Sequence, residues 1–434
     1  MKICDVILYF ISFVVSAGCG SNSEQSKVIV SNNIINVDKA IDDGCDTFLL
    51  SDVASDIDII PLEFDERYVF NNIRKICIDG DDLFLTADLS VILRYNRNGR
   101  LLNAVGRSGE GPEDYLHCFG ISLDSELKRV YVASGFCSEN KIKSYTYSGA
   151  YLGSITVAEK GYSMLGSESD FYDYKQGLHI FRRMLPLMDG GKDIWLLQMQ
   201  DTAANVLSSF YNSVDLAYIN LINGNTFGWE DDFNLKFWTE RSPVYSFYQD
   251  DMNFVFEGND TIFKYDFLSQ KLNHEYILYT NYSHDIEKER KAVKSFDECR
   301  YLRVDDMFET SKYIFLSVEK ENACFLVRYD KEEESACTIK NEGEIRSGGI
   351  NGTYFRAVNP PGFINNLSGG PVFYPEFKTE KEWVKVYSAE ELLECMDKIK
   401  EEDVLMLNKK EKLLSILSSL KEDDNPILLV VKLK

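Results

Sequence analysis

The sequence predicts an all-β protein, a six-bladed β-propeller with short helical insertions near its C-terminus. Two local observations lead to this fold class: a hairpin pattern that recurs at a fixed spacing, and an apolar strand at the end of the sequence. The composition agrees, because 25 Tyr and 27 Phe against 9 Pro favour half-buried pleated strands over disorder. A chain of 434 residues with 44% hydrophobic content is long enough to bury a large core.

The first residues are expected to be a targeting signal and not part of the fold. Met1-Lys2 gives a basic start, residues 6–15 form a largely apolar run, and the small residues 16–18 lead into Cys19. This is the three-part plan of an export signal, and the run is shorter than the roughly 20 residues that a membrane span needs. The sequence therefore predicts a signal peptide over residues 1–18.

Cys19 resembles the lipidated cysteine of a bacterial lipoprotein lipobox, although Ser16 stands where that motif usually has Leu and Asp5 precedes the apolar run. The resemblance implies a lipid anchor on Cys19 and a place in the cell envelope, attached to the outer membrane, with the side that the protein faces left open. The alternative is an ordinary cleaved signal with an incidental Cys. Residues 19–45 begin with small polar side chains and are expected to be a flexible tether, and residues 46–434 are expected to be the propeller.

Eight of the ten cysteines lie beyond residue 19. Their spacing is wide and contains no CxxC pair, so neither a zinc ribbon nor a redox motif is indicated. Export permits disulfides, and two pairs are close enough in sequence to be candidates, Cys118 with Cys137 and Cys324 with Cys337. Sequence alone leaves the connectivity open, and most of the eight are expected to be small buried hydrophobes.

A repeated hairpin suggests the architecture. Residues 93–105 and 143–155 match at a constant offset of 50, and each contains a Tyr-bearing strand, a Gly turn and an exit strand. The Tyr-bearing strand recurs at 262–266 and 326–330, and residues 193–200 fit one more copy. The matching pairs are Tyr95 with Tyr145, Gly99 with Gly149, Leu102 with Leu152 and Val105 with Ile155. Five such units, with short apolar strands before the Tyr strands, are expected to be blades of one propeller.

The two ends of the chain are expected to complete a sixth blade. Residues 62–79 offer strands before the first unit, and residues 427–434 form a short apolar strand. A closed ring avoids a free edge when its first and last strands share a blade. Two insertions are expected to be helical: a capping box over Ser388–Glu391 opens one helix, and residues 409–420 carry apolar side chains at helical spacing.

The stretch from Gly106 to Tyr115 has two interpretations, a phosphate-binding loop and a structural corner between blades. A P-loop requires G-x-x-x-x-G-K-[ST], and a dinucleotide fingerprint requires G-x-G-x-x-G at the start of a helix. Here Gly111 is followed by Pro-Glu-Asp, which removes the Lys and places carboxylates where phosphate would bind. The sequence favours the corner, because Gly and Pro suit its backbone. The motif residues are Gly106, Gly109, Gly111, Pro112 and Tyr115.

These motif residues, the Tyr strands and the closing stretch 421–434 resemble the six-bladed β-propeller lipoproteins that are numerous in gut-dwelling Gram-negative bacteria. That family often shows G-x-x-G-x-G-P-G-E-Y after its first full hairpin, and here Glu113-Asp114 replaces Gly-Glu. Residues 363–375 also look like the segment that leads into the family's last blade. The family's biochemical role is largely uncharacterised, so the resemblance implies a fold and an address but supplies no catalytic residues.

No metal or cofactor site is predicted. The four His residues lie far apart in the sequence, and none falls in HExxH or in a Cys/His cluster. Residues 79–82, Asp-Gly-Asp-Asp, lack EF-hand spacing and are expected to be a solvated hairpin turn. The sequence also contains no G-x-S-x-G nucleophile elbow.

The most ligand-like stretch is 228–238, where two Trp bracket three carboxylates. Exposed aromatic rings beside carboxylates suit a sugar or another cyclic ligand. The alternative is that both Trp pack between blades, since large aromatic side chains are mostly buried. The candidate ligand-binding residues are Trp229, Glu230, Asp231, Asp232 and Trp238.

Charge and motifs together bound the function. A net charge of −23 with a pI near 4.7 repels phosphate backbones, so nucleic acid is not expected as a partner. The pattern favours a non-catalytic envelope lipoprotein that binds a glycan, peptide or protein at the ring mouth or on inserted loops. The alternative is an envelope hydrolase or lyase, because a propeller can carry scattered active-site residues in its central channel.

Overall fold

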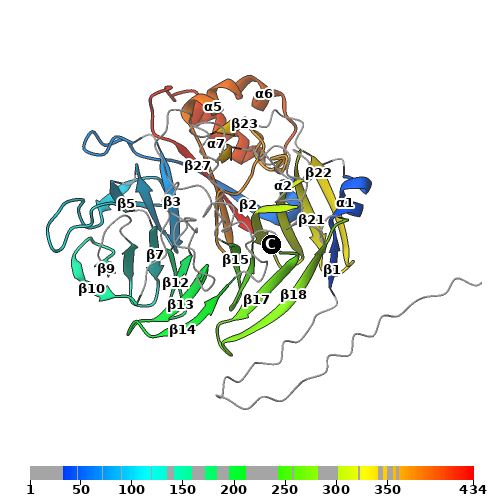
Figure 1. Cartoon of the computed structure of the whole chain (residues 1–434). Coiled ribbons are helices and arrows are strands. Elements are labelled where there is room, and N and C mark those ends of the chain that lie inside the picture. Colours follow the sequence, from blue (N-terminus) through cyan, green and yellow to red (C-terminus); the bar gives the residue numbers. More distant parts are fainter. Residues whose placement is uncertain are drawn as a thin grey trace, which may run out of the picture.

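The computed structural model describes most of the chain from Asn33 to the C-terminus (Figure 1). The described ranges are 33–45, 47–70, 72–88, 90–118, 120–133, 141–158, 172–182, 195–211, 243–256, 259–281, 302–320, 323–340, 346–348, 355–357 and 361–434. Within them, no helix combines the length and the hydropathy needed to cross a bilayer.

Six small sheets follow one another along the chain as the blades of a six-bladed β-propeller, which confirms the predicted fold class (Figure 1). The first strands of four neighbouring pairs of blades contact one another around the ring centre, β25 with β3, β3 with β7, β7 with β11 and β15 with β19, and the later strands lie progressively further out. Blades 1 to 3 contain β3 (Ile73–Asp79), β4 (Asp82–Ala87), β5 (Val91–Asn96) and β6 (Leu101–Ala104); β7 (Gly120–Asp124), β8 (Arg129–Ala133), β9 (Lys141–Thr146) and β10 (Tyr151–Thr156); and β11 (Tyr172–Lys175), β12 (Leu178–Arg182), β13 (Leu197–Asp201) and β14 (Val206–Phe210).

Blades 4 and 5 continue the pattern, and a separate two-stranded sheet follows them in the sequence. Their strands are β15 (Val244–Tyr248), β16 (Asp251–Val255), β17 (Thr261–Asp266) and β18 (Lys271–Tyr279), then β19 (Arg303–Glu309), β20 (Tyr313–Lys320), β21 (Ala323–Asp330) and β22 (Ser335–Lys340); the small sheet holds β23 (Arg346–Gly348) and β24 (Phe355–Ala357). The five predicted Tyr-type units thus correspond to blades 1 to 5, and residues 197–200 of the copy predicted at 193–200 lie in β13, the third strand of blade 3.

Blade 6 is built from both ends of the described chain. The C-terminal strand β27 (Ile427–Leu433) lies between β26 (Glu382–Tyr387) and β2 (Ala54–Pro61), and β25 (Phe377–Lys378) is innermost. The prediction that terminal strands share a blade is confirmed, but the N-terminal strand is β2 and does not come from residues 62–79. The alternation of β2 explains its place, because Ile57 and Ile59 are buried in the core while Asp56 and Asp58, which alternate with them, are partly exposed.

The offset-50 repeat reflects how each blade packs on the one before it. Gly99 and Gly149 lie in the turns between the third and fourth strands of blades 1 and 2, with φ values of 78° and 93°. A Cβ on Gly99 would lie 1.8 Å from the carbonyl oxygen of Pro61, and one on Gly149 would lie 2.7 Å from that of Ala104. Pro61 and Ala104 end the outer strands of the preceding blades. Glycine therefore permits both the backbone conformation and the close approach.

Residues 106–115 form the corner between blades 1 and 2. Gly106 has a φ of 64°, and a Cβ there would approach the rings of Tyr115 and Tyr145 within 2.9 Å and 2.8 Å. The fully buried Tyr115 accepts a hydrogen bond from the backbone N–H of Ile92 and donates one to the carbonyl of Val105. The tyrosine thus ties the corner to the last two strands of blade 1.

The carboxylate of Asp114 occupies the inside of this corner. It accepts hydrogen bonds from the Arg107 guanidinium at 2.9 Å and from the Gly111 N–H at 3.1 Å. A Cβ on Gly109 would lie 2.5 Å from the Asp114 carboxylate, so this glycine makes room for it. Pro112 lies in the turn that follows. The structure gives the motif residues a structural role, with a carboxylate where the phosphate-loop interpretation needs an anion.

The connection from β26 to β27 holds three short helices, α5 (Ala389–Glu394), α6 (Met396–Glu401) and α7 (Leu407–Leu417). They match the two predicted helical insertions, and Ser388 with Glu391 forms the predicted capping box. Their buried residues Leu392, Ile399 and Leu413 belong to the same core as the buried residues of β2 and β27. The helices therefore cover the outer part of blade 6.

The chain before β2 belongs to the fold from Ile34 onward. β1 (Ile34–Asn36) pairs in parallel with β18, the outer strand of blade 4, and α1 (Val37–Asp43) packs against β22, the outer strand of blade 5. The tether expected over residues 19–45 therefore does not include residues 34–45. The physical reason is that Ile35, Val37 and Ala40 are buried in a core shared by blades 4 and 5. A short helix, α2 (Leu50–Val53), then leads into β2.

Cys45 and Cys337 form a disulfide across 292 residues of sequence. Both predicted pairs are wrong, because Cys118 and Cys324 are buried free thiols, and Cys137 lies outside the described residues. The pairing of β21 with β22 places Cys337 opposite Arg328, away from Cys324 at the far end of β21. Sequence proximity therefore misled the prediction, since the partner comes from the chain that precedes the propeller.

Candidate functional site

The alternating strand directions give the propeller two faces. The turns that join the first to the second strand and the third to the fourth strand of each blade lie on one face, here termed the turn face. The other connections lie on the opposite face. Apart from residues 1–32 and 46, the ranges outside the description all fall in connections of this second kind. The turn face and the ring centre are thus the most completely described parts of the molecule.

Among the described residues, two ion pairs cross the centre of the ring. Lys175, at the end of β11 in blade 3, places its Nζ 2.5 Å from Oε1 of Glu380 in blade 6. Blades 3 and 6 stand opposite each other in a ring of six. Lys75 on β3 of blade 1 lies 3.2 Å from Asp173 on β11, so this pair spans past blade 2. Charged side chains from opposite and alternate blades therefore bind one another at the centre.

Other polar groups of the innermost strands are also bound between blades. The Tyr174 hydroxyl of blade 3 donates to the Asp124 carboxylate of blade 2 at 3.2 Å. The Asp306 carboxylate of blade 5 accepts a hydrogen bond from the Tyr374 hydroxyl at 2.7 Å and pairs with Lys378 of blade 6. These contacts hold the inner strands together, because each one joins two blades.

A cluster of polar side chains lies between blades 4 and 5 at the turn face. This junction cluster consists of Asp251, Asn253, Lys264, Glu275, Glu309 and Lys331. Lys264 pairs with Asp251 at 2.8 Å, and Lys331 pairs with Glu309 at 2.6 Å. The buried Asn253 amide donates to Glu309 at 2.6 Å, and its Oδ1 has no hydrogen-bond partner. Each ion pair lies within one blade, and the hydrogen bond from the buried Asn253 to Glu309 joins blade 4 to blade 5.

Glu275 is the unusual member of the junction cluster. The pairing of β17 with β18 shifts register where Ile262 meets Tyr276 and Phe263 meets His274, so Glu275 is the extra residue of a β-bulge. A bulge bends its strand and re-aims a side chain. Burial raises the pKa of Glu275, and the nearby carboxylates of Glu309 and Asp251 add to this effect, while Lys264 opposes it. Glu275 therefore holds a proton more readily than an exposed glutamate does.

The chemistry open to the junction cluster follows from this arrangement. A carboxyl group with a raised pKa beside ionised carboxylates is the pattern that supplies a general acid in hydrolases. Here, however, Glu309 is bound by Lys331 and Asn253, and Asp251 is bound by Lys264. The cluster can hold a proton on Glu275, while Asp251 is bound within blade 4 and Glu309 is bound by Lys331 within blade 5 and by Asn253 of blade 4.

Sequence reasoning did not single out the junction cluster. Its members are spread from residue 251 to residue 331 with no shared motif, and only the pairing of strands brings them together. The sequence of β18, KLNHEYILY, has no regular alternation that marks Glu275 as a bulge residue, so the bulge is known only from the strand register.

The predicted site residues have different outcomes. Trp229, Glu230, Asp231, Asp232 and Trp238 lie outside the described residues, as does Cys19, so these remain predictions. The turn at residues 79–82 is a hairpin turn as expected, and Asp79 in it accepts a hydrogen bond from Tyr147 at 2.7 Å and pairs with Lys128. Across the described ranges, no group of three or more His, Cys, Asp or Glu side chains could hold a metal ion.

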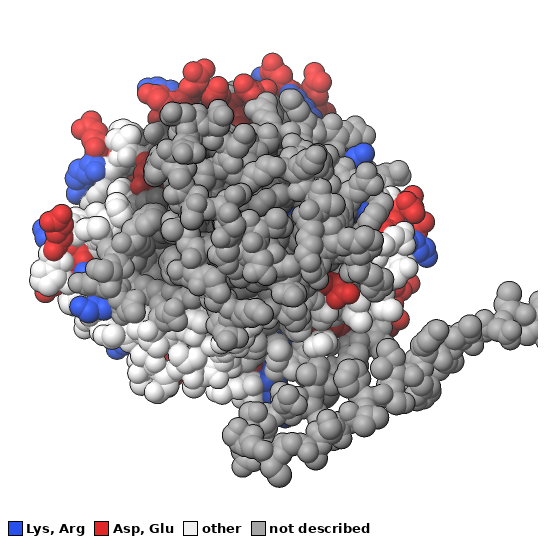
Figure 2. Space-filling view, viewed as in Figure 1, with Lys and Arg blue, Asp and Glu red and all other residues white. Residues whose placement is uncertain are grey.

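Acidic side chains gather on the edge of the molecule formed by the C-terminal helices. Figure 2 shows Asp and Glu along the upper rim, over α5 and α6. Exposed carboxylates there include Glu390, Glu391, Glu394, Asp397 and Glu401. Part of the net charge of −23 is therefore concentrated on this rim, which disfavours contact with anionic polymers.

One family model matches residues 32–432, which is nearly the whole chain. The chain belongs to the DUF4934 family, a domain of unknown function. A search of curated proteins finds no similar sequence. Among solved structures, a crystal structure from Bacteroides fragilis named "Putative exported protein" aligns with a TM-score of 0.58 and 13% identity, covering 90% of this chain and 98% of that one. At this identity the likeness bears on the fold alone.

The WD40 repeats of RRP9 align with a TM-score of 0.38 and 9% identity, covering 89% of this chain and 99% of that one, and this likeness carries no argument. Because DUF4934 is a domain of unknown function, the role of its present member has to be inferred from the site.

Proposed function

We propose that this chain is a non-catalytic, lipid-anchored protein of the cell envelope whose propeller binds a glycan, peptide or protein partner. The observation that carries the proposal is the pair of ion pairs across the ring centre, Lys175 with Glu380 and Lys75 with Asp173. A propeller enzyme uses charged groups at this place to act on a substrate. In this chain the same groups bind one another and so support the scaffold.

The envelope address has separate support. Residues 6–19 follow the plan of a lipoprotein signal that ends at Cys19. The Cys45–Cys337 disulfide fits an oxidising compartment outside the cytoplasm, where such bonds persist. The name of the Bacteroides fragilis neighbour refers to export, which agrees with this address.

Labelling with radioactive palmitate tests the anchor. Cells that express the full chain are expected to incorporate label into it, and Cys19→Ala should abolish incorporation, because the Sγ atom of Cys19 is where the lipid would be attached. Cys395→Ser, which removes a thiol of the folded domain, should leave labelling unchanged. Label that persists in Cys19→Ala would rule out the proposed anchor.

A second candidate function is hydrolysis at the junction cluster. It is favoured by one observation, the bulged Glu275 whose pKa is raised by burial beside Glu309 and Asp251. In this alternative Glu275 would donate a proton to a leaving group. The binding role is preferred, because Glu309 and Asp251 are already engaged by lysines.

A further inference from the structure

Residues 34–45, here termed the N-terminal strap, lie between the proposed anchor and the strand that closes the ring. The chain passes from the strap through α2 directly into β2, the outer strand of blade 6. Any pull on the N-terminus would therefore reach β2 unless the strap itself were fixed to the propeller. β2 matters because its pairing with β27 joins the N-terminal part of the fold to the C-terminal strand and so closes the ring.

The strap is held by blades 4 and 5 along its whole length. β1 pairs in parallel with β18 from Ile34 to Asn36. On α1, the Asp38 carboxylate accepts a hydrogen bond from the Asn281 N–H at 2.6 Å and pairs with Lys320 of blade 5. The carbonyl of Ala40 accepts a hydrogen bond from the Thr338 hydroxyl at 3.1 Å. The strap thus spans the outer edges of two blades before it reaches Cys45.

The Cys45–Cys337 disulfide ends the strap on β22, the outer strand of blade 5. Between the two cysteines the chain contributes β2 to blade 6 and then builds blades 1 to 5 in order. The disulfide therefore closes a covalent loop that runs around the entire ring. A pull on the N-terminus therefore meets a covalent link to blade 5 at Cys45 before it reaches β2.

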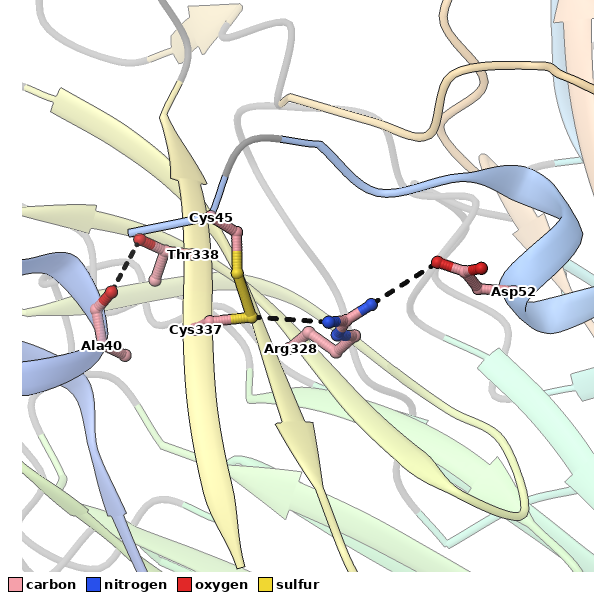
Figure 3. The surroundings of a disulfide bond; sticks show 6 residues. All are labelled: Ala40, Cys45, Asp52, Arg328, Cys337 and Thr338. Atoms are coloured by element: carbon pink, nitrogen blue, oxygen red, sulfur yellow. Dashed lines mark hydrogen bonds and ion pairs between the residues drawn. A yellow bond between two sulfur atoms is a disulfide. The ribbon is translucent and has the colours of Figure 1, made fainter. Parts of the chain in front are cut away.

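Arg328 reinforces the same junction (Figure 3). Its Nη2 lies 3.6 Å from Sγ of Cys337, and its Nη1 lies 3.6 Å from the Asp52 carboxylate of α2. The guanidinium also stands 4.6 Å from the ring centroid of Phe48, a buried residue between Cys45 and α2. The segment just after the disulfide is therefore fixed to blade 5 as well.

We propose that the strap and its disulfide act as a clasp that carries tension from the N-terminal anchor into blade 5 and keeps the closing strand β2 from being peeled off blade 6. The part of this inference that concerns tension in the cell rests on the proposed anchor. The force path itself depends only on the fold, so it can be tested on protein that carries no lipid.

The test is single-molecule pulling on the purified full chain between a handle at the N-terminus and a second handle at Leu127, an exposed turn residue of blade 2. The oxidised chain should show no extension between the release of the strap and the rupture of the folded ring. Cys45→Ser/Cys337→Ser should show an early step of roughly 90 Å as residues 46–71 peel away, because an extended chain spans roughly 3.3–3.6 Å per residue.

Two comparisons keep the test decisive. Cys395→Ser removes a free thiol that takes no part in the disulfide and should pull like the wild type. The wild type reduced with dithiothreitol should reproduce the early step, which covers the case in which the double variant does not fold. An early step in the oxidised wild type, or its absence after reduction, would overturn the clasp. Neither result would bear on palmitate labelling, so failure of the clasp and failure of the anchor can be told apart.

Discussion

Gly99 is required both by the turn in which it lies and by the contact between two blades. Its φ of 78° lies in the left-handed region, and its missing Cβ leaves room for the carbonyl oxygen of Pro61 from the neighbouring blade. The Glu63 N–H also donates a hydrogen bond to the Gly99 carbonyl at 2.8 Å. The turn is therefore both the end of a hairpin and a contact between blades.

Gly99→Ala should destabilise the protein more than Gly177→Ala does. Gly177 has nearly the same φ, 80°, but a Cβ there would meet nothing within 4 Å. Both variants incur the left-handed strain of about 1–2 kcal/mol, and only Gly99→Ala adds the clash with Pro61, worth about 1–3 kcal/mol more. Urea unfolding of the two variants measures the difference. Equal losses of unfolding free energy would show that the contact between blades contributes nothing.

At the scale of single residues, the sequence predicted the repeated glycine turn but not the contact between blades that requires glycine there. The match of Gly99 with Gly149 predicted a repeated turn, because Gly between two strands signals a hairpin. The contact with the preceding blade was out of reach, since Pro61 and Ala104 come near these glycines only in the folded ring. The Cys45–Cys337 pair was missed for the same reason, as its two residues are 292 positions apart.

The closing strand β2 is the element on which the ring depends. Its ladder with β27 runs from Ala54 opposite Leu433 to Pro61 opposite Ile427. On its partly exposed side, Lys409 of α7 pairs with Asp56 at 2.8 Å and with Asp58 at 3.1 Å, and Lys432 of β27 pairs with Asp58 at 3.2 Å. Charges from a helix and from the C-terminal strand therefore hold β2 in place.

These ion pairs predict how the stability of blade 6 depends on pH. Burial alone would raise the pKa values of Asp56 and Asp58. Hydrogen bonds and charges from Lys409 and Lys432 outweigh the effect of burial, so both pKa values lie below their usual range. A lowered folded-state pKa gives stability that is present above the unfolded value of about 3.9 and is lost as the pH falls through the folded value. Unfolding free energy should therefore fall between about pH 5 and pH 2.

Lys409→Met should weaken this dependence. At pH 7 the variant should lose about 1 kcal/mol of unfolding free energy, the upper range for partly exposed pairs, and at pH 2 the difference from the wild type should nearly vanish. Lys412→Met, an exposed lysine in the same helix, is the matched control and should change little at either pH. A loss of equal size at both pH values would mean that Lys409 acts through packing and not through its charge.

Some secondary-structure elements could be predicted from the sequence and others could not. It predicted the C-terminal strand and both helical insertions, because an apolar run and a capping box are local signals. It placed the N-terminal partner in residues 62–79, although the alternation of Ile57 and Ile59 with Asp56 and Asp58 already marked a half-buried strand. The strap was expected to be a tether, because residues after an export signal often are, and its burial against blades 4 and 5 is a tertiary property.

At the scale of the whole molecule, the ring is closed twice. Hydrogen bonds join β2 to β27 in blade 6, and the disulfide joins the strap to blade 5. The ion pairs Lys175 with Glu380 and Lys75 with Asp173 then bind the inner strands to one another at the centre. These two ion pairs among the described residues agree with the proposed scaffold role.

The repeated hairpin in the sequence predicts a β-propeller, but no sequence motif predicts the junction cluster. The junction cluster draws on four strands of two blades and on the turn that holds Lys331, so its members become neighbours only after folding. The aromatic and acidic stretch around Trp229 was visible as composition and stays a prediction.

The central claim is that the propeller binds a partner without transforming it, and one measurement tests it most directly. The purified chain is incubated with a panel of glycans and peptides, and both its melting temperature and the mass of each ligand are recorded. The account predicts a ligand that raises the melting temperature with concentration and is recovered unchanged. Cleavage of a ligand that is lost in Glu275→Gln and kept in Glu332→Gln, an exposed control, would contradict it.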